Sequence, residues 1–120
     1  MASLDILPGD QRAVLELVMR QGRGYEEIER LLSIDRTAVR ARALDALDAI
    51  GPPTTVPAAR RALLADYLLG QLPHRVSDEV RDRLAEAPDE RAWVEAIAFE
   101  LAPIASRALP EIPAASATPT

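Results

Sequence analysis

The stretch from Gly24 to Ile50 constrains the fold of this chain most strongly, because two helical patterns lie in it with only the segment 33–35 between them. From Tyr25 to Leu32 the apolar residues recur at three- and four-residue spacing, which puts them on one face of a helix. The segment 33–35 interrupts this pattern, and its last residue, Asp35, is of a type that caps helix N-termini. A second pattern runs from Arg36 to about Ile50. The stretch therefore predicts a short helix, a tight turn and a longer helix.

The longer helix is expected to separate an apolar face from a basic one. The apolar residues that should face inward are Ile28, Leu31 and Leu32 in the short helix, and Val39, Ala43, Ala46, Leu47 and Ile50 in the longer one. The first two turns of the longer helix then present Arg36, Thr37, Arg40, Ala41 and Arg42. A helix with a basic first half after a tight turn is the arrangement that places side chains in the major groove of DNA. These five residues form the candidate DNA-binding site.

The rest of the chain shows further helical patterns between Gly and Pro breakers. No alternating β-branched run is present in the sequence, so the fold is expected to be all-α. A helix is expected to begin within 7–10 and to end within 20–24, where Gly22 or Gly24 takes the left-handed cap.

Three more helices are expected after the breaker 51–57. The first should run from Pro57 to about Leu72, the second from an N-cap at Ser77 to near Ala87, and the third from Pro88 to a kink or end at Pro103. Their inward residues should be Leu63, Leu64, Tyr67, Leu68, Val80, Leu84, Trp93, Ile97, Leu101 and Ile104.

The breaker divides the chain into a helix-turn-helix unit over 1–50 and a three-helix unit over 57–108. Residues 51–56 are then a linker, and 109–120, rich in Pro and small residues, are expected to be a flexible tail. Each unit has about fifty residues, and units below about 60 residues bury too little surface to be comfortably stable alone. We therefore expect the three C-terminal helices to pack on the N-terminal three.

The charge balance weakens the case for DNA binding. The formal net charge is −5, Lys is absent, and residues 1–50 hold seven Arg against nine Asp and Glu. An acidic protein is not a general nucleic-acid binder. The local cluster of Arg36, Arg40 and Arg42 is therefore all the electrostatic support that DNA binding has in the sequence.

Other function classes find no support in the sequence. The chain has no Cys, so it can form neither a disulfide nor a thiolate zinc site. The sequence shows no nucleophile–base pair, phosphate-binding loop or metal-ligand cluster, so we expect no enzymatic activity, no cofactor, no metal and no small-molecule substrate. The sequence contains neither a membrane-spanning apolar run nor a signal peptide. A cytoplasmic location is therefore expected, as a free protein or as the soluble part of a membrane-anchored one.

From Leu7 to Ile50 the chain resembles the region-four helix-turn-helix of bacterial RNA polymerase sigma factors, especially the small extracytoplasmic-function type. LPGDQRAVLEL resembles the first helix of that family, GYEEIERLLSID its scaffold helix and TAVRARALDAL its recognition helix. This resemblance implies transcription regulation through DNA, with RNA polymerase or a sigma factor as protein partner. Two features differ from the family: Ser33 replaces the usual Gly of the turn, and Asp45 and Asp48 lie where the recognition helix is commonly basic. Fewer cations make fewer phosphate contacts, so weaker DNA binding is expected.

The segments 66–72 and 83–91 resemble the helical domain of zinc-associated anti-sigma factors. The family pattern Tyr-x-x-Gly-x-Leu is present within DYLLGQL, but Arg83, Ala87 and Glu90 replace the His and Cys ligands. A lone carboxylate does not make a tetrahedral zinc site, so packing is expected in place of the metal. In the family this domain holds the DNA-reading parts of a sigma factor. The residues that this role would assign to partner binding are Tyr67, Leu72, Leu84 and Trp93, of which Tyr67 and Trp93 are more simply interpreted as core anchors.

Two function classes stay open. In the first, the anti-sigma-like half controls whether Arg36, Arg40 and Arg42 of the sigma-like half can reach DNA. In the second, the helix-turn-helix has lost DNA binding and binds a sigma factor, the polymerase or a second copy of this chain. DNA binding by a few Arg weakens steeply with ionic strength, whereas an apolar protein interface barely responds to it. Burial of Arg36 and Arg40 in intramolecular ion pairs, or the absence of a tight turn near Ile34, would refute a basic surface offered to a partner.

Overall fold

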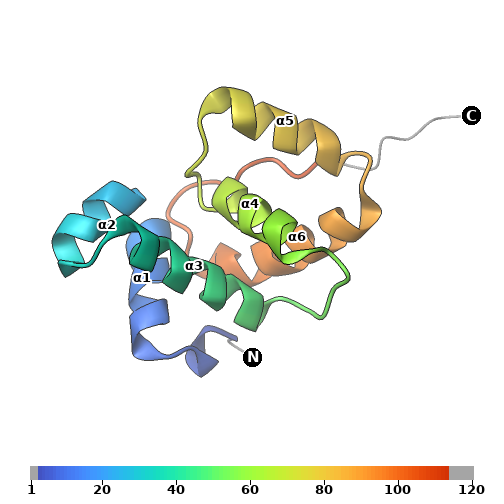
Figure 1. Ribbon diagram of the computed structural model, residues 1–120. Coiled ribbons are helices and arrows are strands. Elements are labelled where there is room, and N and C mark those ends of the chain that lie inside the picture. The colour runs from blue at the N-terminus through green and yellow to red at the C-terminus, as the bar shows by residue number, and fades with distance from the viewer. Residues whose placement is uncertain (1–2, 114–120) are drawn as a thin grey trace, which may run out of the picture.

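The computed structural model describes residues 3–113 (Figure 1). Within that range the chain forms six α-helices and two 3₁₀ turns, without a strand. In chain order these elements are η1 (Ser3–Ile6), α1 (Gly9–Met19), α2 (Tyr25–Leu32), α3 (Arg36–Ile50), α4 (Ala58–Leu68), α5 (His74–Leu84), α6 (Pro88–Leu101) and η2 (Ala102–Ile104). The all-α prediction is confirmed. None of the described helices is both long enough and apolar enough to span a bilayer.

Helix α3 connects the two halves of the molecule, which are the helix-turn-helix unit of α1–α3 and the C-terminal helices α4–α6. It packs against α1 and α2 on one side and against α4 and α6 on the other, and Figure 1 shows it between the N-terminal helices and the C-terminal bundle. The buried apolar residues of all six helices form one core. The expected packing of the C-terminal helices on the helix-turn-helix is confirmed.

Two ion pairs fix the direction of α4 relative to α3. Arg40 in the first half of α3 pairs with Asp66 near the end of α4 at 2.7 Å. Asp48 in the last turn of α3 pairs with Arg61 near the start of α4 at 3.1 Å. The two helices therefore run antiparallel.

The turn between α2 and α3 has the predicted cap. The side chain of Asp35 accepts a hydrogen bond from the backbone N–H of Ala38 at 2.8 Å, which satisfies one of the free donors of the first turn. Ser33 has a φ of 57° and is the single non-glycine residue of the described range with positive φ. A side chain in this left-handed conformation is strained, and glycine is the usual residue at such a position.

We expect Ser33→Gly to raise the free energy of unfolding by about 0.5–1 kcal/mol. The relief of a left-handed residue, about 1–2 kcal/mol, exceeds the added flexibility that glycine gives the unfolded chain, about 0.5–1 kcal/mol. Chemical denaturation followed by circular dichroism measures the change. Ser77→Gly, inside α5, is the matched control and should lower the free energy of unfolding. A loss of stability on Ser33→Gly would contradict the geometry of this turn.

Three predicted helix boundaries are wrong. Helix α4 ends at Leu68 and not near Leu72, because Gly70 adopts a φ of 72° and turns the chain. Helix α5 starts at His74, directly after Pro73, so Ser77 is not an N-cap. Its N–H instead donates to the carbonyl of Pro73 at 2.9 Å within the first helical turn. The same helix ends at Leu84 and not near Ala87.

The boundaries set by the remaining Gly and Pro residues agree with the prediction. Gly22 takes the left-handed conformation after α1, with a φ of 66°. Pro88 is the first residue of α6, where a missing N–H costs nothing. The α-helix stops at Leu101, and Pro103 lies in the 3₁₀ turn that follows.

Most residues predicted to face inward are buried. They include Ile28, Val39, Ala43, Ala46, Leu47, Ile50, Leu64, Tyr67, Leu68, Val80, Leu84, Trp93, Ile97, Leu101 and Ile104, whereas Leu32 and Leu63 are partly buried. Leu31 is the exception, because it is 54% exposed. It lies at the edge of the stripe that α2 turns towards its neighbours, beside the fully buried Ile28.

The chain after η2 contacts both halves of the molecule. The backbone N–H and the hydroxyl of Ser106 both donate to the carbonyl of Met19 at 2.9 Å. The hydroxyl of Tyr67 donates to the carbonyl of Glu111, and Leu109 and Ile112 pack against the core. The described part of the predicted flexible tail, 109–113, is thus irregular chain in contact with the core. Residues 114–120 lie outside the described range.

Arginine side chains make polar contacts around the turn between α5 and α6. The anti-sigma resemblance places its altered zinc-ligand positions at this turn. Glu90 is buried and accepts hydrogen bonds from Arg60 at 2.8 and 3.1 Å. Arg83 lies 3.8 Å from the same carboxylate, and Arg91 donates to the carbonyls of Leu84 and Ala85 at 2.9 Å. The described residues contain no group of His, Asp or Glu that could hold a metal ion.

Candidate nucleic-acid interface

The three arginines of the candidate site point to three different helices. Arg36 lies 2.5 Å from Glu26 of α2, Arg40 pairs with Asp66 of α4, and Arg42 lies 3.5 Å from Asp10 of α1. Each guanidinium thus has an intramolecular carboxylate partner. The side chains are not deeply buried, since Arg36 is 54% and Arg40 43% exposed. The structure therefore pairs these charges without removing them from solvent.

The outermost stripe of α3 carries no basic residue. Thr37, Ala41, Asp45 and Asp48 are exposed, and their spacing of four, four and three residues puts them on one face of the helix. Two of the five candidate residues, Thr37 and Ala41, are on this stripe, whereas the arginines flank it. The second half of the stripe is acidic and would repel the phosphates of DNA.

Asp66 links the two halves through a cluster with Arg40 and Tyr25. Its carboxylate is buried and accepts hydrogen bonds from Arg40 Nε at 3.0 Å and from Arg40 Nη2 at 2.7 Å. Its other oxygen accepts from the hydroxyl of Tyr25 at 2.9 Å. A guanidinium that donates two N–H groups to one carboxylate makes a strong and directional contact. Hydrogen bonding to Asp66 raises the pKa of Arg40. The guanidinium of Arg40 therefore stays positively charged, and the carboxylate of Asp66 compensates this charge.

A second contact lies beside this cluster. The backbone N–H of Tyr25, at the start of α2, donates to the side-chain oxygen of Gln71 at 3.0 Å. The neighbouring Gly24 N–H donates to Glu27 at 3.2 Å, so two free donors of the helix start are satisfied by side chains. The backbone hydrogen bond from Gly24, and then the contact with Arg23, lower the pKa of Glu27.

The phenol of Tyr25 should resist ionisation. Burial, and then the nearby charge of Asp66, raise its pKa well above the ordinary value of 10.0. Because the folded-state pKa is raised, the contribution to stability is complete below the unfolded pKa and is lost as the pH rises from there through the folded pKa. Burial also raises the pKa of Tyr67. The phenol of Tyr25 should therefore stay protonated while the protein is folded.

We expect an alkaline titration to show less phenolate absorbance at pH 10.0 than free tyrosine, which would be half ionised there. The phenolate absorbance of Tyr25 should rise together with the loss of helical circular dichroism, because unfolding exposes its phenol. The variant Tyr25→Phe should lose stability less steeply above that pH than the wild-type protein. Full phenolate absorbance in a protein that remains helical would contradict the burial of Tyr25.

Sequence reasoning missed Asp66, which is the partner of Arg40. A signal for it does exist in the sequence: Asp66 is the one charged residue in the run 63–69, LLADYLL, and residues 64–68 are buried in the structure. An acidic residue within such an apolar run requires a partner, because a buried charge is seldom left unpaired. The identity of the partner depends on the packing of α4 along α3.

The residues predicted to bind a partner lie inside the chain. Tyr67, Leu84 and Trp93 are buried in the core, and Leu72 is partly buried against it. In this conformation their side chains stabilise the C-terminal helices and their contact with α3. A partner could reach Tyr67, Leu84 and Trp93 only after the core opens.

Comparison with known proteins supports the sigma-factor resemblance of the N-terminal part of the chain. Residues 1–50 match the family model described as Sigma-70, region 4. No curated protein and no solved structure matches the chain, and no comparison supports the anti-sigma resemblance of the second half. The match covers α1, the turn and the α2–α3 pair whose geometry is described above. Residues 1–50 thus match a sigma-70 region 4 helix-turn-helix, which indicates a sigma-factor-like DNA-binding or regulatory role.

Proposed function

We propose that this protein is a bacterial transcription regulator in which the C-terminal helices control a sigma-like DNA-binding module through Asp66. The observation that carries the proposal is the pairing of Arg40, on the recognition helix α3, with a buried carboxylate of α4. The region-four match of residues 1–50 supports DNA or the transcription machinery as the partner. The proposal assigns no catalytic role to any residue.

Competition for the guanidinium of Arg40 supplies the mechanism. A phosphate contact requires a cation whose charge and N–H groups are available, and Asp66 occupies two donors of Arg40. The halves share one core, so their separation would be costly. A rotation of the Arg40 side chain is sufficient, because that side chain is 43% exposed. Asp66 thus opposes DNA binding without covering the helix.

The variant Asp66→Asn tests this proposal in the full-length chain. The amide oxygen of Asn can still accept the Tyr25 hydrogen bond, but its negative charge is gone. We expect affinity for a mixed-sequence DNA duplex at low salt to rise by about tenfold, the effect of one charged contact worth about 1.4 kcal/mol. The slope of log affinity against log salt should become steeper by about 0.9, as expected for one more phosphate contact.

The matched control is Glu79→Gln on the exposed side of α5. It removes the same amount of negative charge at a place that does not contact α3, so it reports the general effect of net charge on DNA binding. The proposal is contradicted if Glu79→Gln raises the affinity as much as Asp66→Asn, or if neither variant binds DNA at low salt.

A second candidate function is a protein-interaction module that has lost DNA binding. The acidic outer stripe of α3 favours it, because Asp45 and Asp48 would meet phosphates if this face entered a groove. In that case Asp66→Asn would not create DNA binding. Binding to purified bacterial RNA polymerase core or to a sigma factor would instead persist at high salt, as expected for an apolar interface.

A further inference from the structure

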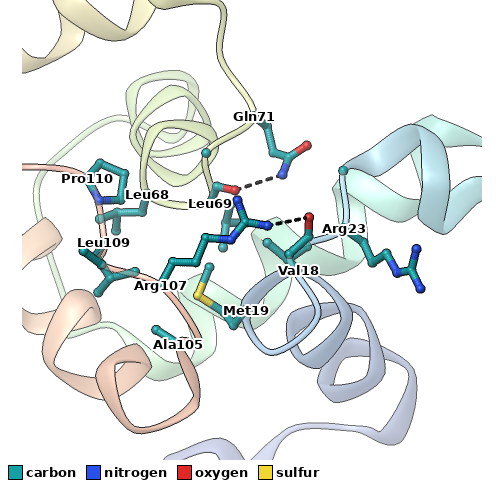
Figure 2. A pocket seen from close by; sticks show the side chains of 14 residues that line it. Val18, Met19, Arg23, Leu68, Leu69, Gln71, Ala105, Arg107, Leu109 and Pro110 are labelled. Atoms are coloured by element: carbon teal, nitrogen blue, oxygen red, sulfur yellow. Dashed lines mark hydrogen bonds between the residues drawn. The ribbon is translucent and has the colours of Figure 1, made fainter.

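A pocket of about 240 Å³ lies at the junction of the two halves (Figure 2). Its walls come from three parts of the chain: the end of α1 with the loop 20–24, the end of α4 with the loop 69–71, and the segment 105–110. Each half thus supplies part of the wall. Below we call this space the junction pocket.

The junction pocket is positively charged in an otherwise acidic protein. Arg23 and Arg107 line it, and no Asp or Glu is among the described residues of its wall. Arg23 is already paired with Glu27 at 3.2 Å. The charge of Arg107 is not matched in this way: within the described range its guanidinium donates to the carbonyl of Gly22 at 3.3 Å and has no carboxylate partner. The pocket therefore offers about one unmatched positive charge.

The remaining wall of the junction pocket is mixed: apolar side chains form one part, and Gln71 with Gly22, Gly24 and Gly70 forms the rest. Figure 2 shows Met19, Leu68, Leu69, Leu109 and Pro110 around the extended side chain of Arg107. Gly22 leaves room for the guanidinium, because a Cβ at this position would lie 1.8 Å from Arg107 Nη2. An apolar surface beside a convergent charged group is a common feature of sites for small organic ligands.

We propose that the junction pocket binds a small organic monocarboxylate. The carboxylate pairs with the fork of N–H groups of Arg107, and a short hydrocarbon body lies against Leu68 and Leu109. A single unmatched guanidinium fits a monoanion better than a phosphate dianion, which needs more donors and more positive charge. The volume is below the roughly 300–1,000 Å³ of drug-sized sites, which limits the hydrocarbon body to a few carbon atoms.

Hexanoate is the probe for the first test, which uses the full-length chain in the absence of DNA. Isothermal titration calorimetry measures its affinity. Hexanol tests the need for the charge, and inorganic phosphate tests the need for the hydrocarbon. We expect hexanoate to bind at least about tenfold more tightly than either of them, since only hexanoate combines a charge-assisted hydrogen bond with a hydrocarbon body.

The variant Arg107→Gln should weaken hexanoate binding by about tenfold or more. Its matched control, Arg75→Gln, removes the same charge from the exposed start of α5, away from the pocket, and should leave the affinity unchanged. Circular dichroism shows whether both variants keep the wild-type fold. The proposal is overturned if hexanoate does not bind the wild-type chain, if Arg107→Gln binds it equally well, or if hexanol or phosphate binds as tightly.

A ligand in the junction pocket touches both halves and adds to the stability of their closed arrangement. Saturating hexanoate should therefore raise the midpoint temperature of thermal unfolding of the wild-type chain. The monocarboxylate site and the DNA-binding function can be refuted independently. Calorimetry without DNA tests the site, and titration of DNA without hexanoate tests the function.

Discussion

Replacing Trp93 with alanine is expected to lower the free energy of unfolding by about 3–5 kcal/mol, as for other large aromatic residues in protein cores. Trp93 is 2% exposed and lies on α6 beneath the end of α3. Its indole nitrogen would be 2.8 Å from a Cβ on Gly51. Folded domains are stable by only about 5–15 kcal/mol, so this substitution removes a large share of the total.

The effect of Trp93→Ala should reach both halves. Because the described helices share one core, the amide protons of α2 and α3 should lose their protection from hydrogen exchange together with those of α5 and α6. Phe99→Ala is the matched control: Phe99 also lies on α6 but is 78% exposed, so its loss should change the stability by no more than about 0.5 kcal/mol. Protection that persists in α1–α3 while the C-terminal helices unfold would show two independent units.

Replacing Arg40 with alanine is expected to lower the free energy of unfolding by about 2 kcal/mol. The substitution leaves the buried carboxylate of Asp66 with the hydroxyl of Tyr25 as its remaining partner. Loss of one partner from a fully buried ion pair costs about 3–5 kcal/mol, and the smaller value here reflects the 43% exposure of the Arg40 side chain. Arg36→Ala breaks an exposed pair and should cost less than about 1 kcal/mol.

A double-mutant cycle separates the ion pair from other effects of these substitutions. In the Asp66→Asn background no buried charge remains to be compensated, so Arg40→Ala should cost less than about 1 kcal/mol. Thermal and urea denaturation of the four proteins measures the coupling. Equal costs of Arg40→Ala in both backgrounds would contradict a direct interaction between the two residues.

The local features of the fold could be predicted from the sequence because neighbouring residues determine them. Asp35 caps α3, Gly22 ends α1 and Pro88 starts α6 through contacts within a few residues. The start of α5 shows the limit of such reasoning. Pro73 and Ser77 were both able to precede a helix, and only the structure shows that the chain uses Pro73.

The arrangement of charges around α3 could not be predicted in the same way. The sequence places Arg36, Arg40 and Arg42 within two turns, but their partners lie on three other helices. Arg40 and Asp66 are 26 residues apart, and they meet because α4 packs antiparallel to α3. A helical pattern identifies the exposed residues of one helix, whereas the charge that each will meet depends on tertiary packing.

The most direct test of the role of Asp66 compares DNA binding by Asp66→Asn with binding by the double variant Asp66→Asn/Arg40→Ala. The double variant contains no uncompensated buried charge at this position, so both proteins should fold and the comparison isolates the guanidinium. If Asp66 restrains DNA binding by holding Arg40, the affinity gained in the single variant will be lost in the double variant. A gain that persists without Arg40 would contradict this account.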